Sequence, residues 1–391
     1  MRNDYEDMEE ESLPEVHVKR RKKSNKVVIF IIELFILLAA LAALYVWQSL
    51  DKIERDEVKS PLELHVNKDL SVETIESMQG YVDIALFGVD NRSNGDTDTG
   101  HSDVIMIASI NKDTKDIKLV SVYRDTFLDT DIDRDSSPNF NKANRAYMIG
   151  GAEQAVKMLN ANLDLDIERY VTVDFKAVTD MVDLVGGVDI DIDSAELKWM
   201  NSYIDTTADV TGAKANHISS TGVQHLDGNQ ATAYARIRYT KGDDYARSAR
   251  QREVINEIVK KLKKADIGTV NNIINTIFPE ISTNFTNMEI LSLAKDALSY
   301  NLSQTVGFPF NKRAGDAGGK KGSVVFAMDL ESNVTALHKF LYEDEAYYPS
   351  SLIREYSASI NEKYNTAIDR GDAPEAVTGE GSISLDEFAR E

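Results

Sequence analysis

Two hydrophobic periods alternate along the chain after residue 80. Short apolar runs bounded by polar turns are typical of buried strands, whereas apolar residues spaced three and four apart are typical of amphipathic helices. The predicted strands lie at 82–90, 103–110, 117–126, 168–175, 186–192 and 324–330. The predicted helices lie at 141–164, 175–185, 253–264, 267–278, 288–300 and 333–342. This alternation predicts an α/β domain with a substantially parallel or mixed sheet.

Residues 27–47 have a different pattern, a continuous apolar run broken by one charge at Glu33. A helix of this length is about 31 Å long, which is enough for one crossing of a bilayer. Basic residues between 19 and 26 precede the run, and Tyr45 and Trp47 close it. The positive-inside rule therefore predicts a single-pass protein of the cell membrane, with the N-terminus in the cytoplasm and the rest of the chain outside. A cleaved signal peptide is the alternative, but its apolar region is usually shorter.

The flanking segments are predicted to lie outside the globular domain. Residues 1–26 form a cytoplasmic tail, 48–80 an extracellular stalk, 81–345 the globular domain and 346–391 an acidic tail. Ten acidic and four basic residues lie between Glu345 and Glu391, with few apolar ones, which predicts disorder. Residues 194–226 are polar and resemble an insertion, in which His217 and His225 are expected at the surface.

Composition excludes several classes of protein. The formal net charge is −21, and this acidity argues against nucleic acid as a partner because phosphate backbones bind basic surfaces. The chain has no cysteine, so it has no disulfide framework, no thiol nucleophile and no thiolate metal site. It also lacks a P-loop, a G-x-S-x-G elbow and a zinc motif.

Arginine is concentrated in one stretch, ARIRYTKGDDYARSARQR at 235–252. Arg236 and Arg238 flank Ile237, and in an extended segment this spacing would place both guanidinium groups on one side. After a turn at 242–244 the pattern becomes helical, and Arg247 and Gln251 continue the apolar stripe of that helix toward its N-terminus. Guanidinium groups and a helix N-terminus suit a diphosphate.

The alternative for these arginines is a solvated face that pairs with Asp243, Asp244 and Glu253. We expect that interpretation to hold for Arg250 and Arg252.

Charged side chains also follow the predicted strands. Asp90, Asp103 and the pair Arg124–Asp125 stand near strand ends, where α/β folds place their chemistry. Asp90 and Asp103 are hard oxygen ligands without a His/Cys set, so a metal held there would be Mg²⁺ or Mn²⁺. Each aspartate alone could equally be a turn or strand-end cap.

Several ordered motifs resemble those of the LytR-CpsA-Psr family of Gram-positive bacteria, over about residues 81–345. These are LFGVD, HSDVIMIASIN, VSVYRDT, NKANRAYMIGGAEQAV, LVGGVDIDI and GVQHLDGNQATAYARIRYTKGDDYARSARQREV. The resemblance implies a mixed-sheet α-β-α sandwich that binds a polyprenyl diphosphate in an apolar groove. It further implies a phosphotransferase that moves a teichoic acid or capsular glycopolymer from an undecaprenyl-diphosphate carrier to peptidoglycan, at the 6-hydroxyl of N-acetylmuramic acid.

The resemblance also implies roles for single residues. Asp90 and Asp103 would hold Mg²⁺, and Asp125 would position Arg124 or act as a base. The diphosphate would be bound by Arg124, Arg236, Arg238 and Gln251, with electrostatic support from Lys142 and Arg247.

One departure from the family pattern is His101, where the family commonly has arginine. Histidine is only partly charged at neutral pH, so activity would rise as the pH falls.

Two other functions remain open from the sequence. One is a non-catalytic receptor for polyprenyl diphosphate that signals through residues 1–26. The other is a polyprenyl-diphosphate hydrolase with water as the acceptor.

Overall fold

The computed structural model describes residues 44, 47–55, 64, 67–89, 101–132 and 137–372. The chain divides into two compact units, Met1–Gln48 and Ser49–Glu391. No helix within the described ranges has the length and apolar character needed to cross a bilayer. The segment predicted to do so, residues 27–47, lies outside those ranges apart from residues 44 and 47.

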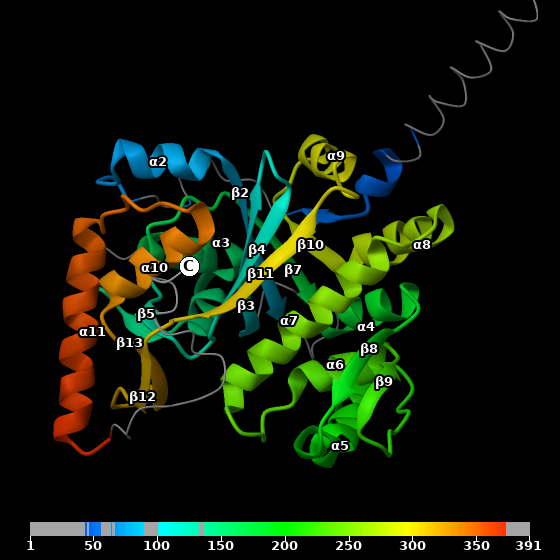
Figure 1. Cartoon of the computed structure of the whole chain (residues 1–391). Coiled ribbons are helices and arrows are strands. Elements are labelled where there is room, and N and C mark those ends of the chain that lie inside the picture. Colours follow the sequence, from blue (N-terminus) through cyan, green and yellow to red (C-terminus); the bar gives the residue numbers. More distant parts are fainter. Residues whose placement is uncertain are drawn as a thin grey trace, which may run out of the picture. The chain divides into compact units, whose positions relative to one another are not determined.

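A mixed sheet of seven strands forms the middle layer of the second unit (Figure 1). Its strands, in spatial order, are β1 (Glu54–Arg55), β10 (Ile281–Thr283), β7 (Arg169–Asp174), β2 (Tyr81–Val89), β3 (Ser102–Asn111), β4 (Asp116–Val122) and β11 (Asn301–Phe308). β2, β3 and β4 form an antiparallel meander, while β7 runs parallel to β2 and β11 parallel to β4. The predicted hairpin and the mixed α/β fold are therefore confirmed.

Helices cover one face of the sheet (Figure 1). They are α2 (Val72–Gln79), α3 (Asn144–Leu163), α10 (Leu330–Tyr342) and α11 (Ser351–Asp369). Alternate strand residues such as Phe87, Ile105 and Val120 point into this layer and join its helices in the largest apolar core. This half of the unit is a closed core.

The other face is covered by α4 (Phe175–Leu184), α6 (Gly228–Arg236), α7 (Asp243–Leu262), α8 (Ile267–Ile277) and α9 (Asn287–Lys295). Here the intervening strand residues, among them Met106 and Leu119, pack with Ile255 of α7. The contact is incomplete, and an apolar pocket remains between the sheet and the helices. The two faces therefore differ in how fully they are packed.

Residues 194–226 are a structural part of this half, so their description as a polar insertion is wrong. α5 (Ser194–Thr211) buries Met200 and Ile204 against α4 and α6. β8 (Val188–Ile192) pairs with β9 (Gly222–Leu226), so the sequence after α5 returns to the core. His217 and His225 are exposed and contact Asp205 and Asp189 respectively.

The predicted boundaries of the globular unit are also wrong in part. Residues expected in a stalk pack on the unit, because Leu50, Ile53 and Leu64 are buried and β1 extends the sheet. Residues 351–369, expected to be disordered, form α11. Ile353 and Ile360 of α11 are completely buried in the large core, although the average composition of the segment is polar.

Two further pairs of short strands complete the unit. They are β5 (Phe127–Asp129) with β6 (Phe140–Lys142), and β12 (Lys312–Asp316) with β13 (Ser323–Ala327). A 3₁₀ turn, η2 (Phe278–Glu280), links α8 to β10.

Candidate functional site: an arginine cluster at the mouth of an apolar pocket

The antiparallel meander brings charged residues from different strands to one edge of the sheet. Asp103 is near the start of β3, and Arg124 and Asp125 follow the end of β4. Because β3 and β4 run antiparallel, these positions meet, and Arg124 Nη1 lies 2.6 Å from Asp103 Oδ1. Asp90 follows β2 in sequence but lies outside the described residues.

A second carboxylate, Asp244, links this edge to α7. Arg124 Nε lies 3.8 Å from Asp244 Oδ2, and Arg247 Nη2 lies 3.2 Å from Asp244 Oδ1. Arg238 reaches both acids, at 3.5 Å from Asp103 Oδ2 and 3.8 Å from Asp244 Oδ1. The residues Arg124, Arg238 and Arg247, together with Arg236, are called the arginine cluster below.

Burial and charge set the ionisation of these groups. Burial alone would raise the pKa of Asp103, but Arg124, Arg247 and Arg238 hold that pKa below its ordinary value. Burial lowers the pKa of Arg247 to about 10, which leaves it charged at neutral pH. Asp103 is therefore a carboxylate, and the cluster around it is fully cationic.

Arg236 and Arg238 reach the same site, but not from the extended segment that their spacing suggested. Arg236 is the last residue of α6, and the helix ends at Ile237, whose backbone is extended. Ile237 is completely buried, so the arginines on either side of it face the pocket. The predicted pairing is borne out by the pocket lining, and the predicted strand is wrong.

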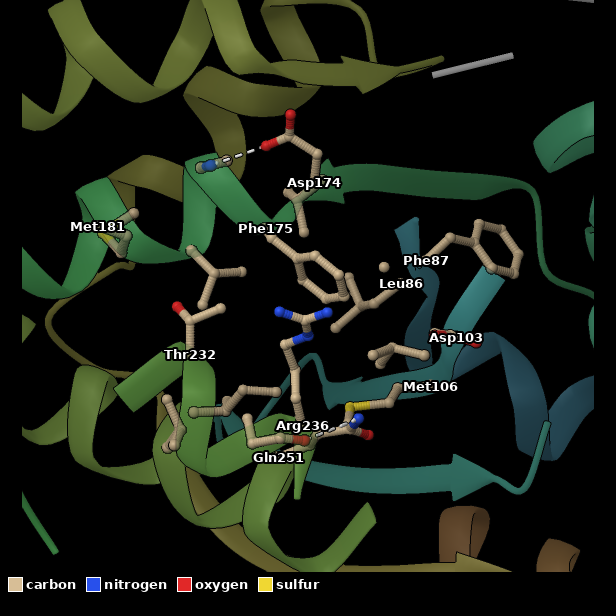
Figure 2. Close-up of a pocket in the computed structure, with 18 of the residues that line it drawn as sticks. Leu86, Phe87, Asp103, Met106, Asp174, Phe175, Met181, Thr232, Arg236 and Gln251 are labelled. Carbon is tan, nitrogen blue, oxygen red and sulfur yellow. Dashed lines mark hydrogen bonds between the residues drawn. The ribbon is translucent and has the colours of Figure 1, made fainter. Parts of the chain in front are cut away.

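Arg236 is held in the pocket by an aromatic ring and a hydroxyl group. Figure 2 shows its guanidinium group beside the ring of Phe175, the first residue of α4. The guanidinium carbon is 4.6 Å from the ring centroid, and Nη1 donates to Thr207 Oγ1 at 2.8 Å. Stacking on an aromatic face fixes the orientation of the guanidinium group.

The predicted turn and helix after the arginine pair are confirmed. Gly242 has φ 93°, a backbone conformation that favours glycine, and it precedes the first turn of α7. Arg247 and Gln251 line the pocket ahead of Val254, Ile255 and Ile258, as the helical spacing predicted. Gln251 Nε2 donates to the Ala235 carbonyl at 3.4 Å, which connects α7 to the end of α6.

Arg250 and Arg252 are buried, so their assignment to a solvated face is wrong. Arg250 Nε lies 2.7 Å from Glu196 Oε1, and Nη1 donates to the Ile237 carbonyl at 2.8 Å. This ion pair anchors α7 to α5 and to the segment that carries Arg236 and Arg238. Its role is structural.

Behind the arginine cluster the pocket is almost entirely apolar. Its volume is about 590 Å³. The sheet contributes Leu86, Met106, Val171, Val173 and Ile281, and the helices contribute Val178, Met181, Val254, Ile255, Ile258 and Ile277. A pocket of this size with charge at one end suits a ligand that has an anionic head and an apolar tail.

Three other predicted residues, Lys142, Asp125 and His101, do not line the pocket. Lys142 Nζ is 3.3 Å from Asp125 Oδ1. Burial raises the pKa of Asp125, an effect that Arg124 and Lys142 oppose. His101 is exposed, and it is not among the residues that line the pocket.

Sequence analysis missed two contributors to the site. Asp244 was considered only as a partner of a solvated face, whereas it contacts three arginines of the cluster. Phe175 was assigned both to the end of a strand and to the start of a helix, and nothing in its spacing placed its ring on Arg236. A carboxylate inside an arginine-rich stretch is the signal that could have identified Asp244.

The described residues offer oxygen ligands for a metal. They contain no group of three or more His, Cys, Asp or Glu side chains arranged to hold an ion. Asp103 is ionised and lines the pocket, and Asp244 Oδ1 is buried without a hydrogen-bond partner among the described residues. This donor set fits Mg²⁺, which usually takes one or two carboxylates and completes its shell with water and phosphate oxygens.

Comparison with known proteins gives a consistent family. The model of the LytR_cpsA_psr family matches residues 45–336. TagU of Bacillus mycoides, a polyisoprenyl-teichoic acid–peptidoglycan teichoic acid transferase, is 30% identical over 281 residues, which cover 71% of this chain and 84% of TagU. TagU of Enterococcus faecalis, which has the same name, is 29% identical over 279 residues, and the match covers 69% of this chain and 80% of that protein.

Two solved structures have the same fold. The crystal structure of a Streptococcus agalactiae protein has a TM-score of 0.55 and 22% identity, and the match covers 73% of this chain and 93% of that one. The crystal structure of TagT from Bacillus subtilis has a TM-score of 0.51 and 20% identity, and the match covers 70% and 98%.

Proposed function

Because the chain belongs to the LytR-CpsA-Psr family, we propose that it is a transferase that moves a glycopolymer from a polyprenyl-diphosphate carrier to peptidoglycan. The product is a phosphodiester between the polymer and the wall, and the glycopolymer is a teichoic acid or a capsular polysaccharide. The relatives TagU of B. mycoides and of E. faecalis carry the corresponding name for teichoic acid.

A single observation supports this function most directly. The arginine cluster stands at the mouth of an apolar pocket of about 590 Å³, in a chain of net charge −21. Arginines held together against their mutual repulsion favour a multiply charged anion such as a diphosphate. An apolar pocket behind that anion favours a ligand whose diphosphate is attached to a hydrocarbon chain.

The residues at the mouth have distinct tasks. Arg124, Arg236, Arg238 and Arg247 bind the diphosphate, and Gln251 offers an amide beside it. Their fixed charge stabilises the negative charge that moves onto the leaving phosphate, which is usually the largest single contribution to catalysis. Because the cluster is already assembled on Asp103 and Asp244, little reorganisation accompanies the reaction.

The chemical step is an in-line displacement at phosphorus. A peptidoglycan hydroxyl oxygen bonds to the phosphorus that carries the sugar, and the bond from that phosphorus to the bridging oxygen breaks. The lipid leaves as its monophosphate. The hydroxyl proton passes to Asp125, whose pKa is raised by burial and whose carboxylate is held by Lys142.

A magnesium ion belongs to the same proposal. Asp103 and Asp90 would hold it, and when bound it would neutralise charge on the diphosphate. The carboxylates of Asp103 and Asp244, which lie among the arginines of the cluster, are oxygen ligands of the kind that Mg²⁺ takes.

The location of the reaction also remains a proposal. An apolar segment at 27–47, preceded by basic residues, would anchor the chain in the cell membrane with the Ser49–Glu391 unit outside the cell. Both substrates, the lipid-linked polymer and peptidoglycan, are then on the same side as the pocket.

The test uses the full chain in lipid vesicles with a polyprenyl-diphosphate-linked saccharide, peptidoglycan oligomers and Mg²⁺. Mass spectrometry should find saccharide phosphate attached to peptidoglycan, and chelation of Mg²⁺ should abolish it. Arg238→Ala and Asp103→Ala should each lower the rate by about 10²–10³-fold, as loss of one stabilising contact to the transition state does in other enzymes. Arg145→Ala is the matched control, because Arg145 is exposed on α3.

The products separate the proposal from its alternatives. Free saccharide phosphate with lipid monophosphate, formed equally with and without peptidoglycan, would identify a hydrolase. Lipid bound by the wild-type protein without any product would identify a receptor.

A further inference from the structure

The apolar face of α8 is exposed in the N-terminal part of the helix. Ile267 is 89% exposed and Val270 43%, and Ile274 follows them at helical spacing. Ile273 and Ile277 continue the same apolar face toward the C-terminal end of the helix, where they are buried against the unit. The residues Ile267, Val270 and Ile274 are called the α8 face. We propose that the α8 face docks on the surface of an anionic lipid bilayer and there opens the apolar end of the pocket to the lipid tail.

Charge beside the α8 face favours an anionic surface. Four lysines, Lys260, Lys261, Lys263 and Lys264, lie at the end of α7, immediately before α8. Lys260 and Lys261 pair with Glu257 and Asp189, whereas Lys263 and Lys264 are exposed and have no carboxylate within ion-pair distance among the described residues. The chain as a whole has a net charge of −21, so this group of lysines is a local exception to its acidic character.

A helix with apolar residues on one side and lysines at its border is the usual pattern of a segment that lies in the bilayer interface. The apolar side chains enter the boundary between headgroups and acyl chains, and the lysines bind anionic headgroups. An apolar protein partner could bind the α8 face without lysines beside it, so the lysines favour an anionic bilayer.

The same helix forms part of the pocket wall. Ile277 at the C-terminal end of α8 and Ile281 of β10, just beyond η2, line the apolar part of the pocket. The exposed stripe and the pocket wall are therefore carried by one helix of eleven residues. If α8 lies in the bilayer interface, a lipid tail that enters between Ile277 and Ile281 would pass directly from the bilayer into the pocket.

The path of the chain places a further constraint on α8. Lys52 Nζ donates to Asn275 Oδ1 at 2.6 Å, and β1 pairs with β10. Figure 1 shows α8 at the outer edge of the unit. The chain thus enters the compact unit along α8, only a few residues after the segment predicted to be the membrane anchor.

Docking is measured without any turnover. The chain has no cysteine, so one can be introduced at Val270 and labelled with an environment-sensitive fluorophore. The control is Val223→Cys on β9, because Val223 is also a valine and is 71% exposed. The full chain is reconstituted in vesicles of phosphatidylglycerol and phosphatidylcholine that contain nitroxide-labelled lipid.

We expect the probe at Val270 to be quenched and blue-shifted, and the probe at Val223 to be neither. Lys263→Gln and Lys264→Gln should each lower the ratio of docked to undocked protein by about fivefold. Vesicles of phosphatidylcholine alone, which carry no net charge, should lower the same ratio. Equal quenching at the two positions would overturn the proposal. So would a blue shift at Val270 that grows with protein density and is insensitive to the quencher, because a second copy of the chain would then cover the α8 face.

The entry of the lipid tail rests on the proposed function and has its own measurement. Ile267→Ser with Val270→Ser should raise the KM for a long polyprenyl carrier in vesicles by about tenfold, since apolar area no longer enters the interface. Transfer from a short, water-soluble carrier should be unchanged, because neither residue lines the pocket. An equal loss with both carriers would overturn tail entry at α8. Absence of transfer from either carrier in the wild type would instead contradict the proposed function and leave the quenching result standing.

Discussion

Removing one partner of the buried ion pair between Arg250 and Glu196 should strongly destabilise the folded chain, and Arg250→Met tests this directly. Methionine keeps most of the side-chain volume but removes three donors, to Glu196, to the Ile237 carbonyl and to Thr240. Glu196 would remain buried, at 8% exposure, without its counter-charge. Breaking one side of a buried pair costs about 3–5 kcal/mol in other proteins.

We therefore expect Arg250→Met to lower the free energy of unfolding by about 4 kcal/mol, measured by urea denaturation of the detergent-solubilised chain. Glu196→Gln keeps the acceptor that binds the Asp193 amide at the start of α5 and removes only the charge. The double variant Arg250→Met, Glu196→Gln should recover about 2 kcal/mol of the loss, because it buries no unpaired charge.

Arg145→Met, at an exposed position of α3, is the control and should stay within about 0.5 kcal/mol of the wild type. A loss no larger than that control would refute the reasoning, since it would mean that Arg250 is not an anchor. Strict additivity in the double variant would show that the two side chains do not depend on each other.

Three further outcomes are expected. Burial and Arg252 lower the pKa of Lys312 to about 8, so the folded state binds fewer protons than the unfolded state above that pH. The free energy of unfolding should then rise by roughly 2 kcal/mol from pH 8 to 10, and Lys312→Met should remove the rise. Phe175→Leu, which removes the ring beside Arg236, should raise the KM for the lipid substrate about 2–30-fold at nearly constant kcat, and a lower kcat at unchanged KM would contradict it. His101→Arg introduces the permanent charge of the arginine that the family commonly has at this position and should raise the rate of transfer; an unaltered rate would exclude a role for position 101.

Much of the fold was predictable from the sequence because its elements carry strong local periodicity. β2, β3, β4, α3, α4, β8 and α10 lie within a few residues of the predicted ranges. The strand β11 was missed because its first half is exposed and carries no clear alternation. Helix α11 was missed for another reason, since its buried residues Ile353, Tyr356 and Ile360 recur at helical spacing inside a segment judged by average composition.

Within the site, the sequence alone was sufficient to select the arginines and Asp103, because a concentration of cations in an acidic chain is visible without coordinates. The sequence could not decide which arginines line the pocket and which are structural. Arg247 and Arg250 are both buried on α7, yet one lines the pocket and the other pairs with Glu196, which is distant in sequence. Only the tertiary contact between α5 and α7 distinguishes them.

The sequence also predicted that Arg236 and Arg238 reach one site, and both line the same pocket, although the local structure it suggested was wrong. Burial of Ile237 between them directs both side chains to the pocket whether the backbone is a strand or a helix end. The pocket itself was decided by tertiary structure alone. Its wall is assembled from β2, β3, β7, β10 and from α4, α5, α6, α7 and α8. An apolar side chain has the same local pattern whether it faces a packed core or an open pocket.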